Sequence, residues 1–158
     1  IELFADPLFS KWKLIIIGDD ALKQTNKENL NGLIHRLGIA QRVVLAGTQL
    51  NVESYLLRSK IFVFTSSSEG FPNAIGEAMS AGLPVIAFDC IAGPSELVQN
   101  GVTGFLVPLF DYAGIKEKLL LLMRNENVRK ELGLNAPKVI HKYAPKKIGD
   151  QYYSFLLS

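Results

Sequence analysis

The sequence is poor in the residues that staple small secreted proteins or bind metals, with one cysteine and two histidines in 158 residues. Cys90 has no internal disulfide partner, which favours a reducing compartment and predicts a cytoplasmic protein. The sequence also lacks zinc-binding spacing, a Walker loop and a G-x-S-x-G elbow. These absences exclude a disulfide scaffold, a zinc protein and a P-loop hydrolase.

Long hydrophobic runs and a strong net charge are missing too. The longest apolar runs, such as 119–123, fall far short of the ~20 residues of a membrane-spanning helix. A net charge of +2 does not favour nucleic acid, and 48% apolar residues exclude disorder. The length suits one domain, and because the chain starts at Ile1 we expect an excised piece of a longer protein.

Short apolar runs alternate with segments of helical period. The runs 14–17, 43–45, 61–64, 85–88 and 105–107 show no polar alternation, as expected of strands buried on both faces of a parallel sheet. Helices are expected at 25–38, 51–58, 72–81 and 94–99, and from about 111 onward with breaks near Pro137 and Pro145. The first of these has a capping box, Thr25 with Glu28, and Gly38 as its stop. The pattern predicts one doubly wound, Rossmann-like α/β domain with a parallel sheet.

Ligands of such domains bind beyond the carboxyl ends of the strands, here the loops 18–25, 47–51, 66–71 and 90–93. In the third, Glu69 and Gly70 precede a helix that starts near Pro72, whose free amides can hold a phosphate or a sugar oxygen. Glu77 lies on the same helix among small and apolar residues, so we expect it to be buried and to need strong donors such as ribose hydroxyls. A structural alternative stays open: Glu69 caps the helix and Glu77 pairs with a nearby Lys or Arg.

Several short motifs around this helix together resemble one enzyme family. They are Glu69-Gly70-Phe71-Pro72-Asn73, Glu77-Ala78-Met79, Gly82-Leu83-Pro84-Val85-Ile86, Gly93-Pro94-Ser95-Glu96 and the segments 18–19, 44–47 and 100–107. The pattern resembles the C-terminal, nucleotide-sugar-binding half of GT-B glycosyltransferases. More narrowly, it is similar to retaining family 4, which has an EX7E motif and builds bacterial lipopolysaccharide, capsule and other glycans. The likeness covers about 95 of the 158 residues.

The resemblance implies a role for each matching residue. Glu69 would be catalytic, bonding the transferred sugar and stabilising charge near its anomeric carbon, and Glu77 would hold the ribose. The other donor-binding positions would be the backbone of Gly70, Phe71, Pro72, Asn73 and Ala74, the base-facing Gly47, Thr48 and Gln49, and Gly18. Pro72 has no N–H to donate. No cofactor or metal is expected, since helix amides and basic groups stabilise the leaving diphosphate.

The sequence departs from the family in two places. An Arg and a Lys that contact the diphosphate, the strand before them and the acceptor-binding domain would all lie upstream of Ile1. We therefore expect the isolated chain to be inactive. The second departure is Asp20, where relatives carry a glycine; Asp19 and Asp20 are more simply a loop than a metal site, because no third ligand is near.

The sequence leaves the exact activity open. We expect a UDP-hexose or UDP-N-acetylhexosamine donor, with a GDP-sugar as second choice, and a surface polysaccharide or lipid-linked glycan as acceptor. A sugar-nucleotide epimerase and a non-catalytic nucleotide-binding module are the alternatives. Cys90 is expected to pack, His35 to be solvated, and the basic stretch around His141 to be solvated surface or, alternatively, a contact for anionic lipid at the inner membrane face.

Overall fold

The structure is a computed structural model that describes residues 1–20, 25–91 and 93–157. The chain divides into two compact units, Ile1–Val52 and Glu53–Ser158. Each has its own parallel sheet, with strand orders β1-β2 and β3-β4-β5, so the predicted α/β class with parallel strands is confirmed. The sequence predicts one sheet, but the structure has two. In the described ranges β1 pairs only with β2, and β3 pairs only with β4, so no strand joins the two sheets.

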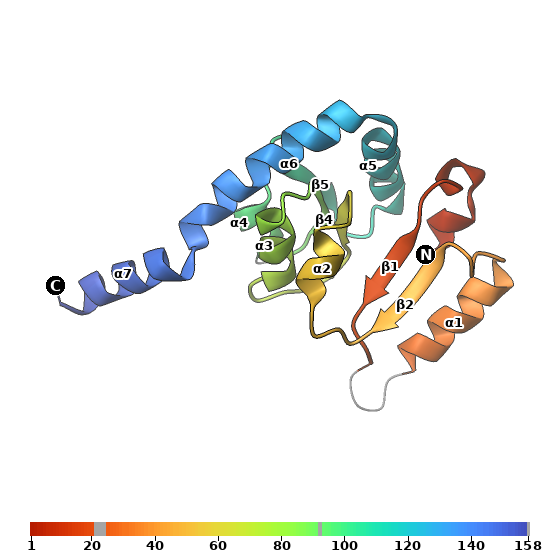
Figure 1. Ribbon diagram of the computed structural model, residues 1–158, viewed down its shortest axis with the longest axis horizontal. Coiled ribbons are helices and arrows are strands. Elements are labelled where there is room, and N and C mark those ends of the chain that lie inside the picture. Colours follow the sequence, from red (N-terminus) through yellow and green to blue (C-terminus); the bar gives the residue numbers. More distant parts are fainter. Residues whose placement is uncertain (21–24, 92, 158) are drawn as a thin grey trace. The chain divides into compact units, whose positions relative to one another are not determined.

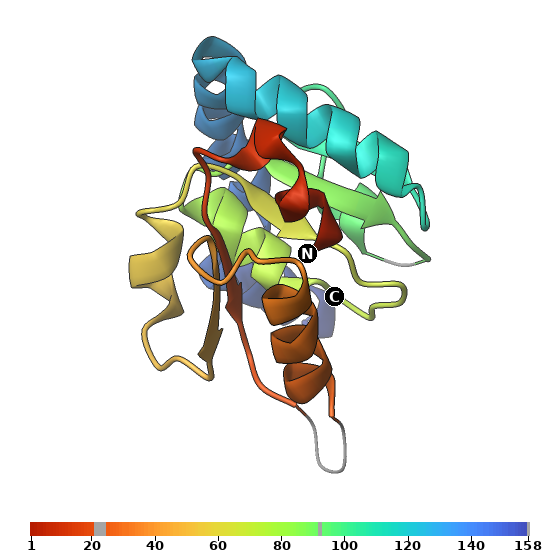
Figure 2. The same ribbon diagram turned by 90° about the vertical axis from the view of Figure 1, so that its right-hand side faces the viewer.

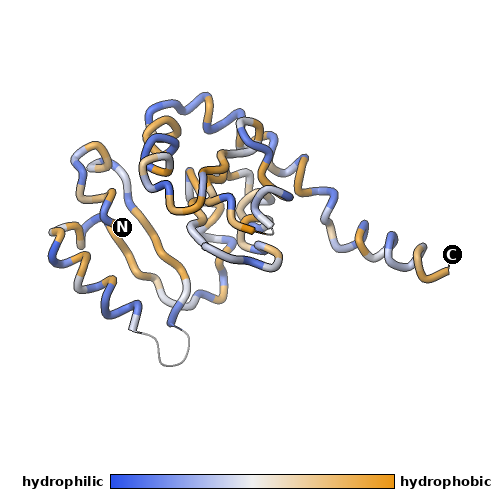
Figure 3. Tube along the Cα trace, turned by 180° about the vertical axis from the view of Figure 1, so that it is seen from behind, coloured by the Kyte–Doolittle hydropathy of each residue, from blue (hydrophilic) through white to orange (hydrophobic). Residues whose placement is uncertain are grey.

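The first unit is a small sheet with one long helix. Its elements are η1 (Glu2–Ala5), η2 (Pro7–Phe9), β1 (Leu14–Ile17), α1 (Asn26–Arg36) and β2 (Val43–Gly47). Both strands are apolar throughout, as Figure 3 shows by colour, and their register pairs Leu14 with Val43. Gly38 ends the helix with a φ of 65°, which lets the Ile39 N–H reach the Ile34 carbonyl at 3.2 Å.

The second unit holds three strands and most of the helices. Its elements follow the order α2 (Val52–Leu56), β3 (Phe62–Phe64), α3 (Asn73–Ser80), β4 (Val85–Asp89), α4 (Pro94–Leu97), β5 (Gly104–Pro108), α5 (Tyr112–Arg124), α6 (Glu126–Ile140), η3 (His141–Tyr143) and α7 (Pro145–Leu156). Helices α3, α4 and α5 pack on the strands, and α6 packs on α3 and α5 (Figure 1 and, turned by 90°, Figure 2). Helix α7 continues beyond α6 with every described side chain exposed.

The central strand β4 confirms the expectation drawn from its apolar sequence. Val85, Ile86 and Ala87 are fully buried, because helices cover both faces of the strand. Gly104 on β5 lies opposite Val85, and a Cβ at this position would overlap the Val85 carbonyl. The close approach of the two strands therefore requires glycine here.

Two expectations about helix ends were wrong. The helix does not break at Pro137, which lies inside α6; the proline removes one hydrogen bond, and packing of α6 on α3 holds the rest. The break comes instead at Asn125, whose side chain accepts from the Val128 N–H at 3.2 Å and starts a new helix. Thr25 is the N-cap of α1 as expected but makes no side-chain cap bond, so the capping box is not formed.

A glycine of α6 gives a test of this packing. Gly133 is buried against the backbone of Gly82, and a Cβ on Gly133 would overlap the Gly82 carbonyl oxygen. Gly133→Ala should therefore lower the free energy of unfolding by about 1–3 kcal/mol, as overpacking does. The matched exchange Gly149→Ala on α7 meets nothing within 4 Å and should leave stability unchanged or raise it by up to about 1 kcal/mol. Urea unfolding of both variants measures this, and equal effects would contradict the packing argument.

Candidate functional site

Helix α3 carries one of the two glutamates on its solvent side. Ile75, Ala78 and Met79 form its inner face and are fully buried. Glu77 is exposed, so the expectation that it is buried was wrong. At about 100° per residue, Glu77 lies almost opposite the centre of the inner face. The small and apolar residues near Glu77 in the sequence form the buried side of the helix, whereas the Glu77 carboxylate faces solvent.

The loop before α3 presents free backbone donors. Pro72 precedes the helix as its N-cap, and the Asn73 N–H donates to the Phe71 carbonyl at 2.9 Å. That amide is therefore used within the loop. The N–H groups of Gly70, Phe71 and Ala74 have no hydrogen-bond partner among the described residues. Three donors and the positive end of the α3 dipole thus remain available to an electron-rich ligand.

This loop is held in place from the side. A Cβ on Gly93, whose φ is 122°, would come within 2.6 Å of Pro72 Cδ, so glycine allows the close contact. The Phe71 ring meets the edge of Tyr143 at 5.7 Å, and the Tyr143 hydroxyl donates to the Glu96 carbonyl at 3.3 Å. Segments before α3, before α4 and after α6 therefore support the same turn.

Among the described residues, neither glutamate has the structural partner that the sequence left open. Glu69 is half-buried in the loop and Glu77 exposed on α3. Within the described part of the chain, neither has an ion-pair or hydrogen-bond partner for its carboxylate, and the N-cap of α3 has no side-chain cap bond. Both carboxylates are thus available to a ligand.

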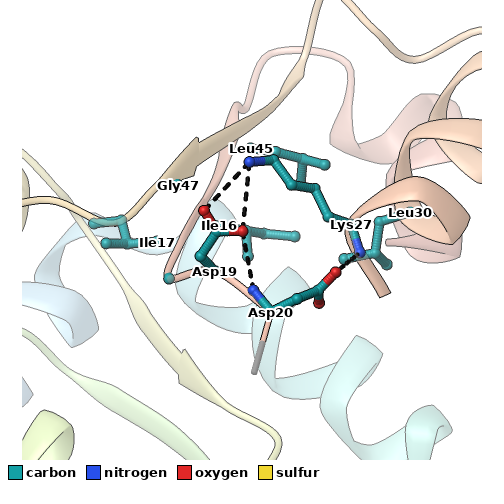
Figure 4. Close-up of a pocket in the computed structure, with 9 residues that line it drawn as sticks. Ile16, Ile17, Asp19, Asp20, Lys27, Leu30, Leu45 and Gly47 are labelled. Carbon is teal, nitrogen blue, oxygen red and sulfur yellow. Dashed lines mark hydrogen bonds and ion pairs between the residues drawn. The ribbon is translucent and has the colours of Figure 1, made fainter. Parts of the chain in front are cut away.

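The first unit has a pocket of its own beyond the carboxyl ends of β1 and β2. Its volume is about 210 Å³ and its lining residues are Ile16, Ile17, Gly18, Asp19, Asp20, Lys27, Leu30, Leu45 and Gly47 (Figure 4). The Gly18 N–H donates to the Gly47 carbonyl at 2.9 Å and continues the β1–β2 ladder one residue past the end of β1. Gly18 and Gly47, two predicted donor-binding residues, therefore come together in one pocket.

Asp19 and Lys27 are the charged pair of this pocket. Lys27 Nζ lies 3.4 Å from Asp19 Oδ2, and the Asp20 N–H donates to Asp19 Oδ1 at 3.0 Å. The Asp20 hydrogen bond, and then Lys27, hold the pKa of Asp19 below its usual value. Asp20 itself accepts from the Lys27 N–H at 2.9 Å, which ties the loop to α1. The two aspartates are loop residues, as expected, and no group of three metal-ligating side chains occurs among the described residues.

The other predicted positions are placed as follows. Thr48 is exposed, and Gln49 is half-buried with its side-chain amide donating to the Ala46 carbonyl at 2.6 Å. Cys90 is buried and His35 exposed, as expected. Residues 21–24 of the first predicted loop and residue 92 of the fourth lie outside the described residues. Among the described residues, no helix combines the length and hydropathy of a membrane span.

The sequence alone missed Lys27, Leu30 and Leu45 as pocket residues. Leu30 falls in the predicted helix 25–38 and Leu45 in the predicted strand 43–45, which accounts for their partial burial but not for the cavity. Lys27 carries a usable signal: it lies in the first turn of a helix that follows a glycine loop. Such a position brings a side chain back over the loop.

The chain belongs to the glycosyl transferases group 1 family, whose model matches residues 1–139. It is 30% identical over 155 residues to an exopolysaccharide phosphotransferase of Streptomyces coelicolor, covering 96% of this chain and 16% of the relative. It is 29% identical over 154 residues to lipopolysaccharide 1,6-galactosyltransferase of Escherichia coli K12, covering 93% of this chain and 40% of the relative. The chain thus spans less than half the length of either relative.

A solved structure has the same fold. A point mutant of Staphylococcus aureus TarM, in complex with fondaparinux, α-GlcNAc-glycerol and UDP, superposes with a TM-score of 0.85 and 27% identity. The match covers 99% of this chain and 31% of TarM. The predicted likeness to the C-terminal domain of a GT-B glycosyltransferase is therefore confirmed at the level of fold and family.

The charged pair allows a pH test. The Asp19 carboxyl should titrate below the usual aspartate pKa, so the Asp19–Lys27 pair persists as pH falls until that lowered pKa is reached. Lys27→Met should move the Asp19 pKa only part of the way back up, because the Asp20 N–H, the larger cause, remains. NMR titration of the Asp19 carboxyl measures both values, with Lys11→Met as the control. An Asp19 pKa that does not respond to Lys27→Met would contradict the pairing.

Proposed function

We propose that this chain is the donor-binding domain of a retaining, family 4 glycosyltransferase. The donor is a UDP-hexose or UDP-N-acetylhexosamine, and the acceptor is a growing surface polysaccharide, such as capsule or lipopolysaccharide, or a lipid-linked glycan. The observation that carries the proposal is the Glu69–Glu77 segment. Among the described residues, it combines two carboxylates without partners and three N–H groups, in and just before the first turn of α3, that are also without partners.

Each group of the segment suits one part of a nucleotide sugar. Glu77, exposed on a helix whose other face is buried, can accept from the two ribose hydroxyls without moving the fold. Glu69 can accept from a hydroxyl of the transferred sugar and stabilise positive charge near its anomeric carbon. The N–H groups of Gly70, Phe71 and Ala74 can donate to the departing diphosphate, whose negative charge the α3 dipole also favours.

The relatives support the type of reaction. Lipopolysaccharide 1,6-galactosyltransferase transfers a hexose, and TarM was solved with UDP. Family membership favours a transferase over an epimerase or a non-catalytic module. By this reading Gly18, Gly47, Thr48 and Gln49 belong to the base side of the donor site. Acceptor binding then falls to a part of the protein outside this sequence, and the reaction needs neither a cofactor nor a metal.

We also place the protein in the cytoplasm at the inner face of the membrane. Lys138, Lys142, Lys146 and Lys147 lie along the end of α6, η3 and the start of α7. The exposed Tyr152 and Phe155 follow on α7. Basic and aromatic side chains in such a series suit the headgroups of anionic lipid.

The ribose role of Glu77 is tested by calorimetry with UDP. Glu77→Ala should weaken binding by about 1.5–3 kcal/mol, roughly ten- to hundredfold in Kd, because it removes hydrogen bonds to a charged group. Glu131→Ala, an exposed glutamate on α6, should leave the Kd unchanged. A Glu77 variant that is folded and binds UDP like the wild type would remove the ribose role. Wild-type protein that binds no nucleotide would reject the proposed function.

The role of Glu69 is tested in the full-length protein with its acceptor. Glu69→Gln should lower kcat by about 10²-fold or more while leaving the Kd for UDP within about threefold, since the lost charge acts on the transferred sugar. Glu131→Gln serves as the matched control. The 158-residue chain by itself should show little or no transfer, and robust turnover by it would contradict the assignment of the acceptor site to another part of the protein.

A further inference from the structure

The proposed function places Gly18 and Gly47 on the base side of the donor, but it gives no role to the charged side chains that line the same pocket, Asp19 and Lys27. Apolar walls come from Ile16, Leu30 and Leu45, and the glycines 18 and 47 leave the end of the strands open. A methyl group at residue 47 would lie 3.9 Å from Asp19 Oδ2 and fill the space beside this carboxylate. The cavity therefore combines apolar side chains with a small group of charged ones, Asp19, Asp20 and Lys27.

That edge presents one hydrogen-bond acceptor and one donor next to each other. Asp19 Oδ2 and Lys27 Nζ are 3.4 Å apart, and Figure 4 shows them facing one another at the pocket. Asp20 is already engaged, because its Oδ2 accepts from the Lys27 N–H at 2.9 Å. Asp19 and Lys27 thus remain the two groups that can exchange their mutual contact for a ligand.

The charge and the apolar walls of the pocket favour some chemical classes of ligand over others. Two aspartates against one lysine make the pocket net negative, which disfavours a phosphate group. Apolar walls suit the faces of an aromatic ring better than a sugar rich in hydroxyls. A planar ring whose edge carries an N–H beside a C=O meets every condition, since the N–H donates to Asp19 and the C=O accepts from Lys27.

We propose that Asp19 and Lys27 read the lactam edge of a nucleobase, uracil or guanine, and so determine the base specificity of the donor. This inference rests on the proposed function, namely that the chain binds a nucleotide sugar. Cytosine and adenine carry a lone pair in place of the ring N–H, which would face the Asp19 carboxylate. To pair with both side chains, cytosine or adenine would have to place its exocyclic amino group at Asp19 and its ring nitrogen at Lys27. This reversed orientation moves the ribose-bearing nitrogen to the other side of the pocket.

The test is calorimetry with UDP, GDP, CDP and ADP on the wild type and two variants. The wild type should bind UDP or GDP at least about tenfold more tightly than CDP and ADP, the size expected for hydrogen bonds to charged groups. Asp19→Asn offers an amide donor to the lone pair of cytosine, so it should lower the preference for UDP over CDP at least about tenfold. Lys27→Met should weaken UDP and GDP binding about tenfold.

Glu28→Gln is the matched control, because Glu28 is exposed on the same turn of α1 and does not line the pocket. It should bind all four nucleotides like the wild type. Variants that keep the full wild-type base preference, or a wild type that prefers CDP or ADP, would overturn the inference while leaving the proposed function intact. A wild type that binds none of the four would reject both. Circular dichroism confirms that each variant is folded. If only one of Asp19→Asn and Lys27→Met folds, its base preference alone tests the inference.

Discussion

The candidate site depends on the burial of one face of helix α3. Ile75, Ala78 and Met79 are fully covered by the sheet of their unit and by α6. Burying side chains as large as Ile75 and Met79 stabilises the helix by about 1.5–3 kcal/mol each. With its inner face fixed, the helix exposes Glu77, and the Ala74 N–H of its first turn has no hydrogen-bond partner among the described residues.

The parts of the fold that the sequence predicts well are those with a local cause. Each strand was foreseen because a short apolar run between polar helices has few other stable states. The predicted helix break at Pro137 was wrong because the sequence shows only the local loss of one hydrogen bond. The packing of α6 on α3, which outweighs this loss, involves a distant part of the chain. The arrangement of the strands in two sheets was not predicted for the same reason: which strands pair depends on contacts between distant segments, and the sequence of a single strand does not specify them.

The site shows the same division. The sequence shows the Glu69–Glu77 spacing but not the exposure of Glu77, because small and apolar neighbours along the chain suggest burial without saying which face of the helix they occupy. Only the helical period separates the two faces. The Asp19–Lys27 pair joins a residue just after β1 to one in the first turn of α1, eight positions further along the chain. No spacing rule predicts such a pair, and it emerges only when the end of β1 and the start of α1 are seen together.

The side chains proposed to contact a ligand are not the ones that stabilise the fold. Glu77, Asp19 and Lys27 are exposed, and an exposed ion pair contributes about 0–1 kcal/mol to folding. The buried residues of α3 and β4, by contrast, offer a ligand no polar group. Exchanging the polar residues therefore changes what the surface can bind while the fold persists, so an altered base preference or Kd in such variants reports on recognition itself.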